Sequence, residues 1–191
     1  MNTIIFDGQQ EGERILYEIH PHQIAKYLAV SRGVLLSLGL VIVLLIIASV
    51  VPTIAGVLST IGIILGFFLI AASVWWNNKV YGQSRTYITD RRIMRFDIVS
   101  PFYQTKRSLF WHEALKAKGY APHFIYRILG IGTVEVTPHM DQHEDVVIPN
   151  VAFFEDIANY IDKILFTYKQ DASNIADFKP FIPKPRGHRG S

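Results

Sequence analysis

The sequence predicts an α+β membrane protein, in which a two-helix transmembrane hairpin precedes an antiparallel sheet that is capped by a C-terminal helix. Three observations predict this order. An uncharged run of 44 residues extends from Gly33 to Trp76, short segments rich in β-branched and aromatic residues follow it, and one amphipathic segment comes last. A long uncharged run is typical of membrane-spanning helices, whereas strands followed by one apolar helical stripe are typical of a small domain that packs a helix on a sheet.

The uncharged run is too long for one membrane span. A span needs about 20 apolar residues, and a single helix of this length would reach roughly 66 Å, about twice the thickness of a bilayer core. Pro52 lies near the middle of the run, and proline removes a backbone donor that a helix interior needs. We therefore expect spans at residues 33–51 and 54–76 with a turn at Pro52 and Thr53, preceded by a cytoplasmic lead-in over residues 1–32.

The basic residues predict the orientation of the hairpin. Three Lys or Arg precede the first span, five follow the second span closely, and the turn between them has none. Because basic residues are enriched on the cytoplasmic side, we expect an integral protein of the cytoplasmic membrane with both termini in the cytoplasm. Tyr27, Trp75 and Trp76 are expected to lie at the membrane–water boundary, where aromatic rings are enriched.

The remainder of the chain predicts one small domain at residues 77–169. The first 18 residues carry no strong pattern, and strands are expected at residues 81–89, 92–99, 102–111, 113–120, 133–137 and 145–149. Residues 124–129 are expected to form a short helical turn. The composition of residues 113–120 also suits a helix, but the surrounding strands favour a strand.

The last helix has the clearest pattern of the domain. Asn150 is expected to cap it, and Glu155 and Asp156 lie in its first turns, where carboxylates suit the helix dipole. Its expected buried stripe consists of Phe153, Ile157, Tyr160, Ile161, Ile164 and Leu165. Residues 170–191 are rich in proline and basic residues and are expected to be extended and disordered.

Three short motifs carry a resemblance to a known family. Residues 11–16 (EGERIL), with the segment 20–22 (HPH), precede the first span, residues 87–93 (YITDRRI) form a predicted hairpin, and residues 129–136 (LGIGTVEV) enter a predicted strand. In this order and with the membrane hairpin, they resemble the bacterial PH-like (pleckstrin-homology-like) membrane-protein family over residues 11–167. The resemblance implies a strongly bent antiparallel sheet with one end plugged by the C-terminal helix, and a domain that acts as an interaction module.

Charge is divided unevenly along the predicted domain. Residues 79–127 hold ten Lys or Arg against three carboxylates, a net charge of +7, whereas residues 128–168 hold one Lys against seven carboxylates, a net charge of −6. Anionic cytoplasmic lipid attracts basic residues near a membrane. The candidate basic patch, which would face lipid or an acidic partner, consists of Arg91, Arg92, Arg95, Lys106 and Arg107. The alternative is a set of solvated strand faces that protect sheet edges.

A polar loop contains the residues that most resemble metal ligands. His139 and His143 lie close in sequence to three carboxylates, Asp141, Glu144 and Asp145. Imidazole and carboxylate groups suit zinc, and a metal-dependent hydrolase is therefore a remote alternative. The expected reading is a polar loop with no metal, because the spacing of the two histidines would align them only on a helix. The absence of cysteine excludes a disulfide framework and a cysteine nucleophile.

Small residues in the two spans predict close helix packing. Gly62 and Gly66 form such a pair in the second span, and Gly33 and Ser37 form one in the first span. They serve either to pack the hairpin on itself or to join copies of the chain.

These observations together predict a protein that is not an enzyme and has no cofactor. We expect a PH-like module that is anchored at the cytoplasmic face and binds a protein partner with help from membrane lipid, with no nucleic acid as a partner. The alternative is a membrane scaffold or pore that self-assembles through glycine faces and sheet edges.

Overall fold

The structure is a computed structural model in which two units are described separately. The described residues are 5–100, 102–139, 144–171, 175 and 177–183. The hairpin unit consists of Gln23–Gln83 and Ile98–Gln104. The sheet unit consists of the described residues of Met1–His22, Ser84–Asp97 and Thr105–Ser191.

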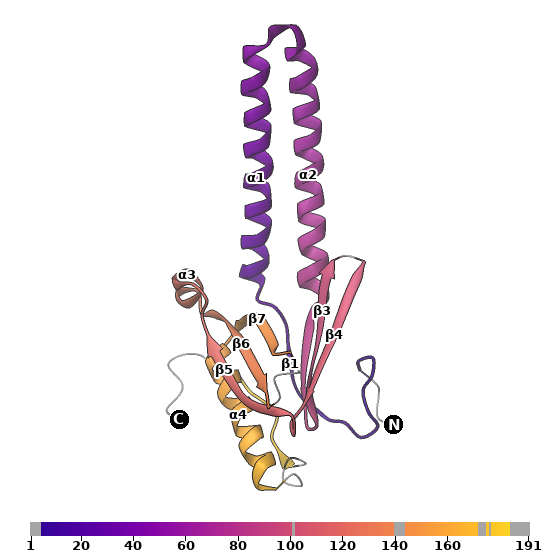
Figure 1. Cartoon of the computed structure of the whole chain (residues 1–191), viewed down its shortest axis with the longest axis vertical. Helices are drawn as coiled ribbons and strands as arrows, with labels where there is room; N and C mark the ends of the chain where they lie inside the picture. The colour runs from indigo at the N-terminus through magenta and orange to yellow at the C-terminus, as the bar shows by residue number, and fades with distance from the viewer. Residues whose placement is uncertain (1–4, 101, 140–143, 172–174, 176, 184–191) are drawn as a thin grey trace. The chain divides into compact units, whose positions relative to one another are not determined.

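Two long helices joined by one tight turn form most of the hairpin unit (Figure 1). Helix α1 covers Gln23–Val50, the 3-10 turn η1 covers Pro52–Ile54, and helix α2 covers Ala55–Gln83. The backbone of Val51, with φ −119° and ψ 82°, lies outside the helical region, which is disfavoured for the residue before a proline. The predicted break at Pro52 is confirmed, and both helices extend beyond the predicted spans at the ends away from the turn.

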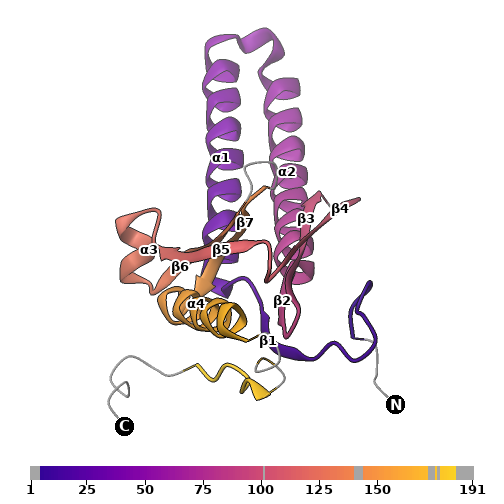
Figure 2. The same cartoon turned by 60° about the horizontal axis from the view of Figure 1, so that its bottom comes forward.

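Four antiparallel strands form the first sheet, in the order β1-β2-β3-β4 (Figure 2). Their bounds are Ile15–Ile19 for β1, Arg85–Thr89 for β2, Arg92–Ser100 for β3 and Tyr103–Phe110 for β4. The sequence pattern did not indicate β1, which pairs with β2 so that Ile19 lies opposite Thr86. The strand expected from residue 81 starts at Arg85, because α2 continues to Gln83.

The hairpin is therefore an insertion between two neighbouring strands of one sheet. Strand β1 precedes α1 in the chain and β2 follows α2, with residues 20–22 and Ser84 as the two short connections. The expected boundary of the domain at residue 77 is wrong for this reason. Residues 15–19 of the expected lead-in belong to the sheet, and the first ten residues of α1 belong to the helix pair.

Three antiparallel strands form the second sheet, in the order β5-β6-β7. The bounds are Ala114–Tyr120 for β5, Ile131–Pro138 for β6 and Val146–Ala152 for β7, and the short helix α3 covers Phe124–Ile128 between β5 and β6. The strands are thus divided between two sheets rather than joined in one bent sheet. The strand expected at residues 113–120 and the helical turn expected at residues 124–129 are confirmed.

Helix α4, Phe154–Gln170, lies on the second sheet and closes the core (Figure 1). Its buried residues are Phe154, Ile157, Ala158, Ile161, Ile164 and Leu165. Gly132 on β6 makes the contact possible, because a Cβ there would lie 2.3 Å from the ring carbon Cγ of Phe154. Gly119 on β5 does the same, since its Cβ would lie 2.7 Å from the carbonyl oxygen of Phe154.

The start of α4 differs from the expected cap. Asn150 belongs to β7 and its carbonyl oxygen accepts a hydrogen bond from the backbone N–H of His22 at 2.6 Å. The N-cap position is Phe153, whose backbone is left-handed with φ 55° and which makes no side-chain cap. Phe154 and not Phe153 is the buried aromatic residue of this turn, so the expected stripe was displaced by one residue at its first position.

The described part of the C-terminal segment packs on the sheet unit, although the sequence predicts a disordered tail. Ile175 is buried, and Phe178 and Phe181 pack against the core. The backbone N–H of Phe181 donates to the carbonyl oxygen of Leu16 at 3.3 Å, which attaches the segment to β1. Its apolar residues, which the proline and charge pattern obscured, account for the difference.

Candidate functional site

The helices of the hairpin unit expose an extensive apolar surface. Both are long and apolar enough to span a membrane, and only 11% of the most apolar 18-residue stretch of each is buried. The exposed side chains include Leu35, Leu36 and Ile46 on α1 and Ile64, Phe67 and Phe68 on α2. A contiguous apolar surface of this extent is rare on soluble monomers and is typical of helices that contact lipid or a partner.

Three of the exposed aromatic residues lie toward the ends of the helices away from the turn. Tyr27, Trp75 and Trp76, the residues expected at a membrane boundary, are all exposed. The ring of Trp75 lies 6.2 Å from that of Phe102, which follows β3 and is 89% exposed. At about 1.5 Å per residue, Trp75 lies roughly 30 Å along α2 from the turn, which equals the thickness of a bilayer core.

The predicted small-residue faces pack α1 against α2. A Cβ on Gly66 would lie 2.2 Å from Cγ2 of Val41, and one on Gly33 would lie 1.9 Å from Oγ of Ser73. Gly62 is buried and faces Leu44, where a Cβ would lie at 3.3 Å. Ser37 is also buried, and its hydroxyl donates to the carbonyl oxygen of Gly33 at 2.9 Å. Gly33, Gly62 and Gly66 therefore lie in the contact between α1 and α2, and the hydroxyl of Ser37 bonds within α1.

Arg92 is buried and does not belong to a surface patch. Its Nε and Nη2 atoms each lie 3.0 Å from a carboxylate oxygen of Glu13, and Nη2 also donates to the carbonyl oxygen of Gly8 at 2.6 Å. The hydroxyl of Thr89 lies 2.8 Å from the Oε1 atom of Glu13. The expectation that Arg92 faces lipid or a partner is wrong, because its guanidinium is enclosed by these acceptors.

Burial and hydrogen bonding act in opposite directions on Glu13. Burial alone raises the pKa of its carboxyl, because the charged form loses water. Hydrogen bonds from Arg92, from the backbone N–H of Gln10 and from Thr89 favour the carboxylate, and the net effect is a pKa below the ordinary value. Glu13 is therefore held as a carboxylate by its partners.

The other four members of the predicted basic patch also have partners. Arg91 is exposed and donates to the side-chain oxygen of Gln10 and to the carbonyl oxygen of Glu11. Arg95 pairs with Asp97 at 2.7 Å and its side chain is 12% exposed.

The last two members pair with carboxylates from elsewhere in the sheet unit. Lys106 contacts the carboxylate of Asp7, and Arg107 pairs with Glu144 at 3.0 Å. The five residues thus do not form one free basic surface, although Arg91, Lys106 and Arg107 keep exposed side chains.

The predicted polar loop is described only in part. His143 and Asp141 lie outside the described residues, so no distance between the side chains of His139 and His143 can be given. Within the described ranges, no group of three His, Asp or Glu side chains is placed to hold a metal ion.

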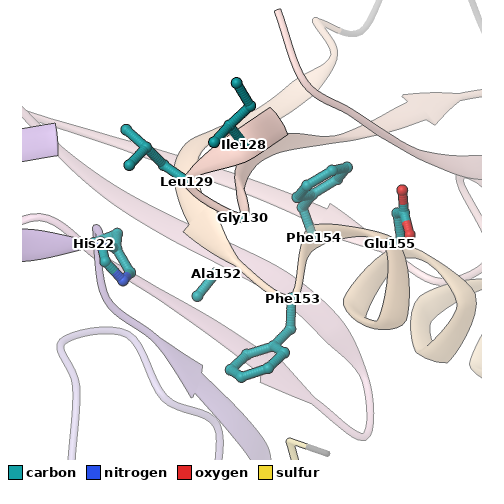
Figure 3. Close-up of a pocket in the computed structure, with 8 residues that line it drawn as sticks. All are labelled: His22, Ile128, Leu129, Gly130, Ala152, Phe153, Phe154 and Glu155. Atoms are coloured by element: carbon teal, nitrogen blue, oxygen red, sulfur yellow. The ribbon is translucent and has the colours of Figure 1, made fainter. Parts of the chain in front are cut away.

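An open cleft in the sheet unit lies beside α3 (Figure 3). Its volume is about 320 Å³, and its lining residues are His22, Ile128, Leu129, Gly130, Ala152, Phe153, Phe154 and Glu155. Gly130 has a left-handed backbone, φ 69°, which ends the α3 turn directly before the first residue of β6. Sequence reasoning missed this cleft, because residues from the N-terminal connection, α3 and the start of α4 meet only in the folded chain.

Helix α3 exposes large apolar side chains. None of its residues is buried, and the exposed fractions are 76% for Phe124, 63% for Ile125 and 67% for Ile128. Leu129, the residue after the helix, is also exposed. The spacing i, i+1, i+4 and i+5 places these four positions on one face of α3 and the residue that follows it.

No model of a protein family, no curated protein and no solved structure matches this chain.

Proposed function

We propose that this chain is a membrane-anchored interaction module. In this proposal α1 and α2 span the cytoplasmic membrane, and the sheet unit is a PH-like domain at the cytoplasmic face that binds a protein partner with help from anionic lipid. The observation that carries the proposal is the exposed apolar surface of two helices that are long enough to cross a bilayer. In a bilayer this surface is solvated by lipid chains, and the backbone groups are paired within the helices.

Chain connectivity supports a domain on one side of the membrane. Both ends of the hairpin continue into neighbouring strands, from β1 before it and into β2 after it. Because Ile19 and Thr86 pair across these strands, the two ends of the hairpin cannot lie on opposite faces of a bilayer. In this proposal the hairpin crosses the membrane twice, and the turn at Pro52 lies on the other side.

The distribution of charge supports the cytoplasmic side. Lys26 and Arg32 lie in the first ten residues of α1, and Lys79 lies near the end of α2, whereas the turn has no basic residue. This asymmetry follows the positive-inside rule. The exposed rings of Tyr27 and Trp75 are spaced from the turn by a distance that suits the opposite boundary of a bilayer.

The order of elements supports the PH-like assignment. Antiparallel strands are followed by one helix, α4, which covers the second sheet and completes the core. The motif at residues 87–93 corresponds to the β2–β3 hairpin, and the motif at residues 129–136 enters β6. The segment at residues 11–16 contributes Glu13 to the ion pair with Arg92 and the first residues of β1.

An interaction role is preferred to the two alternatives. The scaffold or pore depended on glycine faces and sheet edges that join copies, and of these the glycine faces are occupied by Val41, Leu44 and Ser73 of the same hairpin. Nothing within the described part of the chain favours the hydrolase.

Cysteine accessibility tests the proposed topology, since the natural chain has no cysteine. Thr53→Cys places a thiol in the turn, and Asn159→Cys places one on the exposed side of α4. In intact cells a membrane-impermeant maleimide should label Thr53→Cys, whereas Asn159→Cys should be labelled only after permeabilisation. Labelling of both or of Asn159→Cys alone in intact cells would contradict the proposal.

Crosslinking in native membranes tests the proposed partner. We expect one protein to be recovered in constant proportion with the full chain after mild purification. Crosslinks exclusively between copies of this chain would instead favour the scaffold.

A further inference from the structure

The exposed apolar surface of α3 requires a separate explanation, because it belongs to the sheet unit and not to the hairpin. Phe124, Ile125 and Ile128 are each more than 60% exposed on a helix of five residues that buries none of its side chains. The transfer of such apolar side chains out of water is favourable. An exposed apolar turn of this kind is therefore a candidate for contact with a lipid bilayer or with another protein.

Exposed basic side chains on the chain segment that carries α3 favour an anionic surface as that contact. Residues 114–134 contain no Asp or Glu, and they include Lys116, Lys118 and Arg127, all with exposed side chains. Carboxylates from other segments also lie near it in the fold, since Glu135 is opposite Lys118, Asp162 accepts from the backbone N–H of Ala117, and Glu155 lines the cleft with Ile128. Lys118 also lies 5.2 Å from the ring centroid of Tyr120, at the end of β5. Apolar side chains flanked by basic residues are typical of segments that enter the headgroup layer of an anionic bilayer.

The position of α3 in the sheet unit favours the bilayer further. Ile128 and Leu129 line the same cleft as His22 (Figure 3). His22 immediately precedes Gln23, the first residue of α1. The last residue of the sheet unit before the hairpin therefore lines the same cleft as the end of α3.

We propose that α3 is a second membrane contact, which inserts Phe124, Ile125 and Ile128 into the headgroup layer of an anionic bilayer while Lys116, Lys118 and Arg127 meet lipid phosphates. This inference rests on the proposed membrane anchoring and adds an interface that is separate from the spans. Insertion of α3 restricts the orientation of the sheet unit at the membrane surface, which determines the face that a protein partner can reach.

Depth measurements on the full chain test the inference. Three single-cysteine variants, Ile125→Cys on α3, Ile63→Cys on α2 and Asn159→Cys on α4, are labelled with an environment-sensitive fluorophore. Each is reconstituted in nanodiscs of phosphatidylcholine with phosphatidylglycerol and quenched with spin-labelled lipid. We expect the emission maximum of the fluorophore at position 125 to lie at a shorter wavelength than that of the fluorophore at position 159. Spin labels on the lipid headgroups should quench the larger part of the emission at position 125 and should not quench the emission at position 159.

The charge part of the proposal has its own comparison. In nanodiscs of phosphatidylcholine alone, quenching at position 125 should be weaker than in nanodiscs that also contain phosphatidylglycerol. The variant Lys116→Gln/Lys118→Gln/Arg127→Gln should show the same weaker quenching in nanodiscs that contain phosphatidylglycerol. Equal quenching in all three cases would overturn the role of the basic residues.

The outcomes separate the inference from the proposed function. If the label at position 63 is not quenched by spin labels on the acyl chains, the membrane anchoring itself fails. If position 63 is quenched but position 125 stays in water, the anchoring holds and the α3 contact is overturned. In that case a protein partner that covers α3 in native membranes becomes the favoured occupant.

Discussion

The side chains of Glu13 and Arg92 form a two-point ion pair that is shielded from water. The Nε and Nη2 atoms of Arg92 each lie 3.0 Å from a carboxylate oxygen of Glu13, with side-chain exposures of 8% and 0%. Glu13 precedes the hairpin in the chain and Arg92 follows it. The pair therefore joins two segments of the sheet unit that 78 intervening residues separate, including both long helices.

Removal of one partner should destabilise the sheet unit strongly. Arg92→Ala leaves the Glu13 carboxylate buried without its counter-charge, and a loss of this kind costs about 3–5 kcal/mol. Thermal unfolding in mild detergent can be followed through Trp111, which is buried and donates from Nε1 to the carbonyl oxygen of Thr89 at 3.0 Å. A background with Trp75→Phe and Trp76→Phe makes Trp111 the source of tryptophan emission.

Arg91→Ala is the matched control for this prediction. Arg91 is the preceding residue and also a basic one, but its side chain is exposed and donates to neutral acceptors. We expect a small effect on the melting temperature. Similar melting temperatures for the two variants would show that the pair with Glu13 contributes little to stability.

Acid should weaken the ion pair in a defined range of pH. The folded-state pKa of Glu13 lies below its ordinary value of about 4.5, so its contribution to stability is present above that pH. The contribution is lost as the pH falls through the lowered pKa. The difference in melting temperature between the natural chain and Glu13→Gln should therefore be constant from pH 7 to about 5 and become smaller below about 4.5. A constant difference down to the lowest pH at which both fold would contradict the assignment.

The same ion pair shows what sequence reasoning could not reach. Adjacent arginines at positions 91 and 92 look alike as sequence, and both were predicted to face lipid or a partner. Their burial differs because Arg92 meets Glu13, which is distant in sequence and is brought near by the pairing of β1 with β2. Long-range pairing of this kind leaves no local pattern.

Elements with a local pattern were predicted well. The uncharged run and Pro52 were sufficient for the hairpin, and the β-branched and aromatic composition of β3 and the alternating residues of β6 were sufficient for strands. Strand β1 was missed because its five residues pair across the inserted hairpin. The exposure of α3 was missed for a different reason, since an apolar turn has the same sequence whether it is buried or exposed.

Close packing of the hairpin predicts opposite effects for two glycines. Gly66→Ala places a Cβ about 2.2 Å from Cγ2 of Val41, so the Val41 side chain or the helices must shift, at a cost of about 1–3 kcal/mol. Gly39→Ala meets nothing within 4 Å and should be neutral or stabilising, because alanine is the better helix former. Thermal unfolding in mild detergent, read by circular dichroism of the helices, compares the two.

A second change distinguishes packing within the hairpin from packing between copies. Val41→Ala removes the methyl groups that meet position 66, so the double variant Gly66→Ala/Val41→Ala should recover part of the loss caused by Gly66→Ala. The mass of the protein in mild detergent should be the same for all three variants. A fall in mass with Gly66→Ala would instead indicate that this glycine joins copies of the chain.

A cluster of aromatic rings should hold the C-terminal segment on β1. The ring of Phe181 lies 4.8 Å from that of Tyr17 and 5.2 Å from that of Tyr160, whose hydroxyl donates to the carbonyl oxygen of Lys179 at 2.8 Å. Ring contacts of this kind contribute about 0.5–1.5 kcal/mol each beyond the area they bury. Phe181→Ala should therefore raise the hydrogen-exchange rate of the segment by about ten-fold, which corresponds to roughly 1.4 kcal/mol.

Ile182→Ala provides the comparison for this last prediction. Ile182 is the neighbouring residue, but its side chain is 76% exposed, and its loss should leave exchange unchanged. Hydrogen exchange measured by mass spectrometry on a peptide that covers residues 177–183 reports both variants. Rapid exchange of this peptide already in the natural chain would show that the segment does not stay on β1 in solution. Slow exchange that is lost in Phe181→Ala alone would identify the ring contacts as the cause, because the proline content of the segment is the same in both variants.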